Sequence, residues 1–167
     1  MRVRTRSVRE LDRIDRRILR LLQSDGRLPV SEVAEQVGLS PTPCAERIRR
    51  LERDGFILGY HARLDPHALG QSLLVFVEIK LAHKSGPIFD EFRREVIKLP
   101  NVLDCHLVSG EFDYLIKARI PEMSAYRKML GDMLLALPAA RESRSYIVME
   151  EIKESLELTI DEPLASG

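Results

Sequence analysis

The sequence predicts an α+β protein in which an N-terminal winged-type helix-turn-helix domain is joined by a hinge to a ferredoxin-like βαββαβ domain. Apolar residues recur at helical spacing through the first part of the chain, whereas branched and aromatic runs alternate with helical patterns after the hinge. The hinge contains Pro66 and Gly70, which favour a turn. Charge divides the chain as well. Residues 1–60 hold 13 Arg and 9 acidic residues, and residues 61–167 hold 13 Lys and Arg and 17 acidic residues.

These changes in pattern define the domain boundaries. The first domain spans residues 1–61, the hinge 62–71 and the second domain 72–167. A basic segment joined to an acidic one, within a chain of zero net charge, is typical of a nucleic-acid-binding module attached to a domain with another task.

The first domain begins with two predicted helices. In the first of these, Asp12 can cap the free N–H groups and Gly26 marks the end. Its apolar face consists of Leu11, Ile14, Ile18, Leu21 and Leu22. The second helix lies in the sequence PVSEVAEQVG and ends at Gly38. Its inward residues are expected to be Val30, Val33, Ala34 and Val37.

A third helix is expected to start at Ser40 and Pro41 and to end at Gly55. The serine can cap free N–H groups, and a proline in the first turn loses no intrahelical bond. The narrow apolar stripe of this helix is Cys44, Ile48 and Leu51. Only Leu39 and Ser40 separate it from the second helix, so the two form a helix-turn-helix whose third helix is placed to enter a DNA major groove.

The exposed face of the third helix is rich in arginine, which favours contact with DNA. We expect its N-terminal residues, Thr42, Pro43 and Glu46, to read base edges and its arginines to bind phosphates. The candidate DNA-binding residues are Ser40, Thr42, Pro43, Glu46, Arg47, Arg49, Arg50 and Arg53. Such a face can equally be a solvated surface with intrahelical ion pairs. The basic arm Met1–Arg9 leaves the same alternatives open, phosphate contact or a solvated tail.

The second domain is predicted to alternate strands and helices in the order βαββαβ. The expected strands are 72–81, 102–108, 112–120 and 141–149, and the expected helices are 87–99 and 124–137. Ser124 can cap the second helix. This order places both helices on one face of the sheet, and we expect a second copy of the chain to cover the other face. Residues 150–160 resume an alternating pattern and are expected to add an edge strand or to cross to the partner.

The remaining composition argues against catalysis, metal binding and membrane insertion. Cys44 and Cys105 are too few for a disulfide framework, and each lies in an apolar pattern, so we expect two buried thiols. The four histidines show no metal-ligand spacing: His61, His67, His83 and His106. The sequence contains no nucleophile elbow, phosphate loop or membrane-length apolar run. We therefore expect a cytoplasmic protein that is not an enzyme and holds no metal.

Six runs that span nearly the whole chain are characteristic of one family. They are LDRIDRRIL (11–19), VGLSPTPCAERIRRLERDGFI (37–57), SLLVFVEI (72–79), CHLVSGEFDYLIK (105–117), PEMSAYRKML (121–130) and YIVMEEIK (146–153). On these runs the chain resembles the Lrp/AsnC family of bacterial and archaeal transcription regulators. The resemblance implies a nucleoid-associated activator or repressor that binds double-stranded DNA. It also implies a homodimer that assembles into an octamer or hexadecamer, and an amino-acid effector such as leucine, bound between dimers, without any other cofactor.

A candidate effector site lies in the turn Ser109–Tyr114. An amino acid presents an ammonium and a carboxylate close together, so its site needs an acceptor charge and backbone N–H groups. Gly110 can expose N–H groups and Asp113 can supply the charge, although Glu111 and Asp113 can also be ordinary hairpin residues. The resemblance adds positions of the family's leucine response. The full effector set is Gly110, Glu111, Asp113, Met123, Tyr146, Ile147 and Val148.

Two positions of this set depart from a close relative. Ile147 stands where the relative has valine, and Glu111 where it has aspartate. We expect the extra methylene of Ile147 to narrow the pocket. The expected effector is therefore leucine or another aliphatic amino acid, and not leucine alone. Two other functions remain open: an architectural DNA-wrapping protein that ignores metabolites, and an amino-acid sensor whose first domain contacts proteins instead of DNA.

Overall fold

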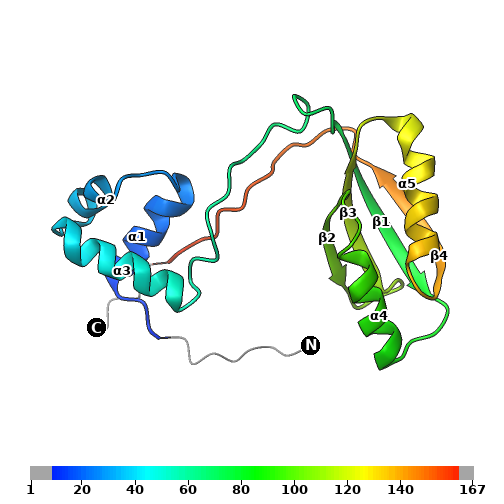
Figure 1. Ribbon diagram of the computed structural model, residues 1–167, viewed down its shortest axis with the longest axis horizontal. Coiled ribbons are helices and arrows are strands. Elements are labelled where there is room, and N and C mark those ends of the chain that lie inside the picture. The colour runs from blue at the N-terminus through cyan, green and yellow to red at the C-terminus, as the bar shows by residue number, and fades with distance from the viewer. Residues whose placement is uncertain (1–8, 162–167) are drawn as a thin grey trace. The chain divides into compact units, whose positions relative to one another are not determined.

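The computed structural model describes residues 9–161, which form two compact units (Figure 1). The helical unit contains residues 9–63 and 154–161, and the sheet unit contains residues 64–153. The predicted basic arm, apart from Arg9, lies outside the described residues, as do the last six positions of the chain. The structure thus assigns residues 154–161 to the first unit, whereas the sequence pattern places them in the second domain.

The helical unit contains three helices around one small core, as predicted. They are α1 (Arg13–Ser24), α2 (Val30–Val37) and α3 (Pro41–Arg53). The Asp12 side chain caps α1 by accepting the Asp15 N–H at 2.8 Å. Gly38 ends α2 in the left-handed conformation, with φ of 74°, which glycine adopts at no steric cost. The core residues are Ile18, Leu22, Val33, Ala34, Val37, Cys44, Ile48 and Leu51.

Several local predictions for this unit are wrong. Val30 is 38% exposed and lies outside the core, because it is the first residue of α2 and precedes the turn that packs inward. Ser40 occupies the N-cap position of α3, but its hydroxyl makes no capping bond. Within residues 9–63 no strand follows α3, and Phe56 and Ile57 pack against the helical core. A wing that pairs with a strand of another copy stays a prediction.

The segment 154–161 lies along α1 in an extended conformation without forming a strand (Figure 1). Arg16 and Arg20 donate to the carbonyl oxygens of Asp161 and Ile160, both at 3.0 Å. The Gln23 amide both donates to and accepts from the Leu158 backbone, at 2.9 and 3.1 Å. The predicted edge strand over 150–160 is therefore wrong, because these backbone groups bond to side chains of α1.

The sheet unit has the predicted βαββαβ order. Its elements are β1 (Leu73–Leu81), α4 (Gly86–Val96), β2 (Val102–Leu107), β3 (Tyr114–Ile120), α5 (Met123–Ala136) and β4 (Ala140–Ile147). The strands pair antiparallel in the order β2-β3-β1-β4. Both helices pack on one face, where Phe92 and Met133 meet the inward residues of β1 and β3. Glu122, and not Ser124, is the N-cap of α5, so the helix starts two residues earlier than a cap at Ser124 implies.

Within residues 64–153, the opposite face of the sheet carries no helix. Because side chains alternate along a strand, the burial of Val75, Val77 and Ile79 under the helices places Phe76, Glu78 and Lys80 on this open face. Cross-strand partners on it have opposite charge: Glu78 lies beside Arg144, and Lys80 beside Glu142. The open face therefore combines an apolar position with positions of opposite charge on neighbouring strands.

Candidate functional site

The outward face of α3 presents most of the residues predicted to bind DNA. Cys44, Ile48 and Leu51 are buried, which confirms the predicted inward stripe. The exposed candidates are Ser40, Thr42, Pro43, Glu46, Arg49 and Arg53. Within residues 9–161, Arg49 has no ion-pair partner, and Arg53 has only a long contact to its neighbour Asp54, at 3.5 Å. These two cations therefore face solvent with their charge uncompensated or weakly compensated.

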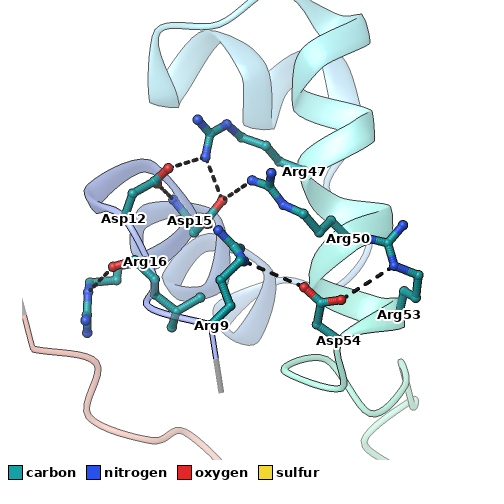
Figure 2. A network of polar contacts seen from close by, with 9 residues as sticks. Arg9, Asp12, Asp15, Arg16, Arg47, Arg50, Arg53 and Asp54 are labelled. Carbon is teal, nitrogen blue, oxygen red and sulfur yellow. Dashed lines mark hydrogen bonds and ion pairs between the residues drawn. The ribbon is translucent and has the colours of Figure 1, made fainter. Parts of the chain in front are cut away.

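The other two arginines of α3 bind carboxylates of α1 (Figure 2). Asp15 is fully buried, and its Oδ1 accepts from Arg47 at 2.8 Å and lies 3.5 Å from Arg50. Its Oδ2 accepts from Arg9 at 2.6 Å. Arg47 also donates to Asp12 at 2.5 Å. Asp15 thus gathers three guanidinium groups from two segments of the helical unit, and it fastens α1 to α3.

The electrostatics of this cluster favour its charged form. Burial alone would raise the pKa of Asp12, but the Asp15 N–H and the Arg47 guanidinium lower it below its usual value. Hydrogen bonds to Asp12 and Asp15 raise the pKa of Arg47. Arg47 is therefore paired with two carboxylates, and Arg50 lies 3.5 Å from one of them. The sequence pattern of α3 predicts phosphate contacts for both and does not indicate these acceptors. The signal for them was present in an acidic pair, Asp12 and Asp15, one helical turn apart at the start of α1.

Asp113 is the best-defined residue of the predicted effector set. It is 4% exposed and directly precedes β3. Its Oδ2 accepts the Leu81 N–H at 2.9 Å, and its Oδ1 lies 2.6 Å from the Lys84 ammonium. Burial alone would raise the pKa of Asp113, but Lys84 and the Leu81 N–H lower it. Asp113 is therefore an anion at neutral pH that already holds an ammonium group.

The turn before Asp113 contains backbone N–H groups without a backbone partner. Gly110 has φ of 148°, and a side chain built there would meet open space. Within residues 9–161, the N–H groups of residues 109–112 donate to no backbone carbonyl, whereas the Asp113 N–H donates to Ile79 at 2.9 Å. A carboxylate can reach such free donors next to a buried anion. This end of the sheet thus places a buried carboxylate beside backbone N–H groups that have no backbone partner.

The remaining effector residues lie at the other end of the sheet. The Val148 N–H donates to the Leu74 carbonyl, whereas Asp113 binds the backbone of Leu81, seven residues further along β1. At the rise of an extended strand these positions are about 20 Å apart. Met123, at the start of α5, lies near the Val148 end, because β3 ends beside Leu73. One copy of the chain therefore does not bring the predicted set together.

The hollows of the sheet unit do not replace this site. A hollow of about 60 Å³ lies on the open face beside the turn, lined by Glu111 and Phe112 with residues of β1 and β4. Ligand pockets usually hold about 300 Å³ or more, so this hollow is too small for an amino acid. A groove of about 520 Å³ between α4 and β2 contains none of the predicted effector residues. Met123, Tyr146 and Ile147 are exposed and line neither of these hollows.

Two further properties concern only the described residues. Across 9–161, no three His, Cys, Asp or Glu side chains lie close enough to hold a metal ion. No helix in that part of the chain is long and apolar enough to cross a membrane. Cys105 is half buried, and burial raises the pKa of its thiol to about 11, so it is protonated and unreactive at neutral pH.

Comparison with known proteins covers both units. A model of the AsnC-type helix-turn-helix domain matches residues 11–52, and a model of the Lrp/AsnC ligand binding domain matches residues 74–158. The leucine-responsive regulatory protein of Escherichia coli K12 is 58% identical over 152 residues, which cover 91% of this chain and 93% of the relative.

Solved structures agree with this match. A transcriptional regulator of Neisseria meningitidis in complex with L-Met has a TM-score of 0.85 at 35% identity, over 91% of this chain and 98% of the other. A feast or famine regulatory protein of Mycobacterium tuberculosis complexed with L-methionine has a TM-score of 0.83 at 33% identity, over 91% and 100%. Both units of the fold described above are thus found together in known regulators.

Proposed function

Because the chain belongs to the Lrp/AsnC family of DNA-binding transcription regulators, we propose that an aliphatic amino acid controls it by binding at Asp113. The observation that carries the proposal is the buried Asp113 carboxylate, which has one oxygen on a backbone N–H and the other on an ammonium. The protein is a transcription regulator and not an enzyme. The proposal concerns the identity of the effector and the residues that bind it.

For the DNA contact, we assign the outward face of α3 to the groove. Thr42, Pro43 and Glu46 occupy the N-terminal part of α3, which reaches base edges in a helix-turn-helix. Arg49 and Arg53 bind phosphates, or a guanine edge in the case of one of them. Arg47 and Arg50 set the position of α3 through Asp15, and they contribute to DNA affinity mainly by keeping that position.

For the effector, we propose a site completed by two copies of the chain. Asp113 and the free N–H groups of residues 109–112 hold the ammonium and the carboxylate of the amino acid. Met123 and residues 146–148 of another copy surround its apolar side chain. Within one copy they lie about 20 Å away, and Met123, Tyr146 and Ile147 are exposed while Val148 is half-buried. The name of the E. coli relative suggests leucine, and the two methionine complexes suggest a pocket that also accepts an unbranched side chain.

A site completed by two copies couples binding of the effector to assembly of the protein. A ligand shifts an equilibrium only if it binds the competing states with different affinity. A site formed by two copies exists in one assembly and not in another, so the effector favours the assembly that contains it. Dimers that assemble into octamers or hexadecamers provide such competing states.

Titration calorimetry with leucine and methionine tests the proposal on the wild type, Asp113→Asn and the control Glu91→Gln. We expect Asp113→Asn to abolish binding, because the amide cannot balance an ammonium, and Glu91→Gln to change it little, because Glu91 is exposed on α4 and outside the proposed set. DNA affinity without effector should be equal for wild type and Asp113→Asn in a mobility-shift assay. Full binding by Asp113→Asn would contradict the proposal and direct attention to the 520 Å³ groove. No binding by the wild type would favour the architectural alternative.

A further inference from the structure

The oxygen of Asp113 that the proposed function gives to the effector is already occupied. Oδ2 is used by the Leu81 N–H, and Oδ1 lies 2.6 Å from the Lys84 ammonium. We propose that Lys84 is a resident cation that the ammonium group of the effector must displace, and that this competition sets the affinity of the sensor. This inference rests on the proposed function, since it concerns the same site.

The two partners differ in a way that suits exchange. Asp113 is buried and fixed by its backbone: its N–H donates to Ile79 and its carbonyl accepts from Val108, both at 2.9 Å. Lys84 is 57% exposed at the end of a flexible side chain, in the connection between β1 and α4. A lysine ammonium that leaves this contact returns to water at little cost. The acceptor therefore stays in place while the cation exchanges.

Charge explains why a resident cation is needed. A buried carboxylate without a counter-charge is costly, so Lys84 stabilises the site when no effector is present. An amino acid brings the same charge, and the exchange leaves the site balanced. A carboxylic acid of the same shape brings no cation and cannot take the place of Lys84. The contact thus selects for a ligand that carries an amine. It also lowers the apparent affinity for the effector, because the effector can bind only the fraction of sites from which Lys84 is displaced.

Lys84→Met in the full-length chain tests the inference. Calorimetry should show leucine and 3-methylbutylamine binding about three- to tenfold more tightly than to the wild type, the range expected for loss of one half-exposed competing ion pair. Binding of 4-methylpentanoate, which has no amine, should not tighten. Lys80→Met is the matched control, because Lys80 adds to the field at Asp113 without touching it. Lys84→Arg should bind leucine with the wild-type affinity, because it keeps a cation at this position. Thermal unfolding checks that each variant is folded.

The outcomes separate the two proposals. If wild type and Lys84→Met bind leucine equally, Lys84 does not compete, and the inference is overturned while the proposed function stands. Weaker binding by Lys84→Met would make Lys84 part of the effector site, which also overturns the inference. If neither protein binds any amino acid, the proposed function and the inference fail together.

Discussion

Replacing Asp15 by asparagine should strongly destabilise the helical unit. The carboxylate is fully buried and meets Arg9 at 2.6 Å, Arg47 at 2.8 Å and Arg50 at 3.5 Å. Removing one partner of a buried ion pair costs about 3–5 kcal/mol when the remaining charge is stranded. Here the guanidinium groups are 25–36% exposed and can recover part of their hydration, so we expect about 2–3 kcal/mol.

Thermal unfolding, followed by the circular dichroism signal of the helices, measures this loss of stability. For a unit of this size, a loss of 2–3 kcal/mol lowers the melting temperature by about 10 °C or more. Glu35→Gln is the matched control: it removes one carboxylate from an exposed position of α2, and we expect a change within about 0.5 kcal/mol. A loss below about 1 kcal/mol for Asp15→Asn would refute the reasoning, because Arg47 and Arg50 would then not depend on Asp15.

Three further predictions concern the same unit. The lowered pKa of Asp12 means that its stabilising contribution is present above pH 3.8 and is lost as pH falls through its folded pKa. Asp12→Asn should therefore flatten the acid side of a stability–pH curve. An unchanged curve would contradict the pairing of Asp12 with Arg47. Arg49→Ala should reduce the log–log salt slope of DNA binding by about 0.9, while the exposed Arg94→Ala on α4 should leave it unchanged, and equal slopes would remove Arg49 from the interface. Ending the chain after Lys153 should lower the stability of the helical unit by about 1–2 kcal/mol, because Arg20 and Gln23 lose their partners; an unchanged melting curve would show that the segment 154–161 contributes nothing.

The elements of the fold could be predicted because each buries one periodic face. Ile18 and Ile48 recur at helical spacing with their neighbours, and Val75, Val77 and Ile79 alternate along a strand. The pattern of apolar residues therefore indicates which side chains pack in the two cores. The edge strand predicted over residues 150–160 was wrong. Short apolar stretches such as Phe56–Ile57 and residues 154–161 fit a strand equally well, and tertiary partners decide where they lie.

The residue types at the candidate sites could be predicted from the sequence, but the groups that these side chains bind could not. Nothing in the spacing of α3 distinguishes Arg47 and Arg50 from Arg49 and Arg53, because the difference arises from Asp15 on another helix. Lys84 is missed for a similar reason: its ammonium reaches Asp113 from a loop 29 positions away in sequence. The effector set came from a resemblance, which does not state whether its members belong to one copy or to two.

A mixing experiment tests most directly whether two copies complete the effector site. Asp113→Asn and Ile147→Asp should each abolish leucine binding when assembled alone. Co-expressed in equal amounts, they should recover about a quarter of the sites, because random assembly of a symmetric oligomer then pairs an intact Asp113 with an intact Ile147 from another copy at that frequency. Titration calorimetry on the mixed assembly measures this fraction. Recovery near a quarter is the result we predict, and no recovery would contradict a site shared between copies.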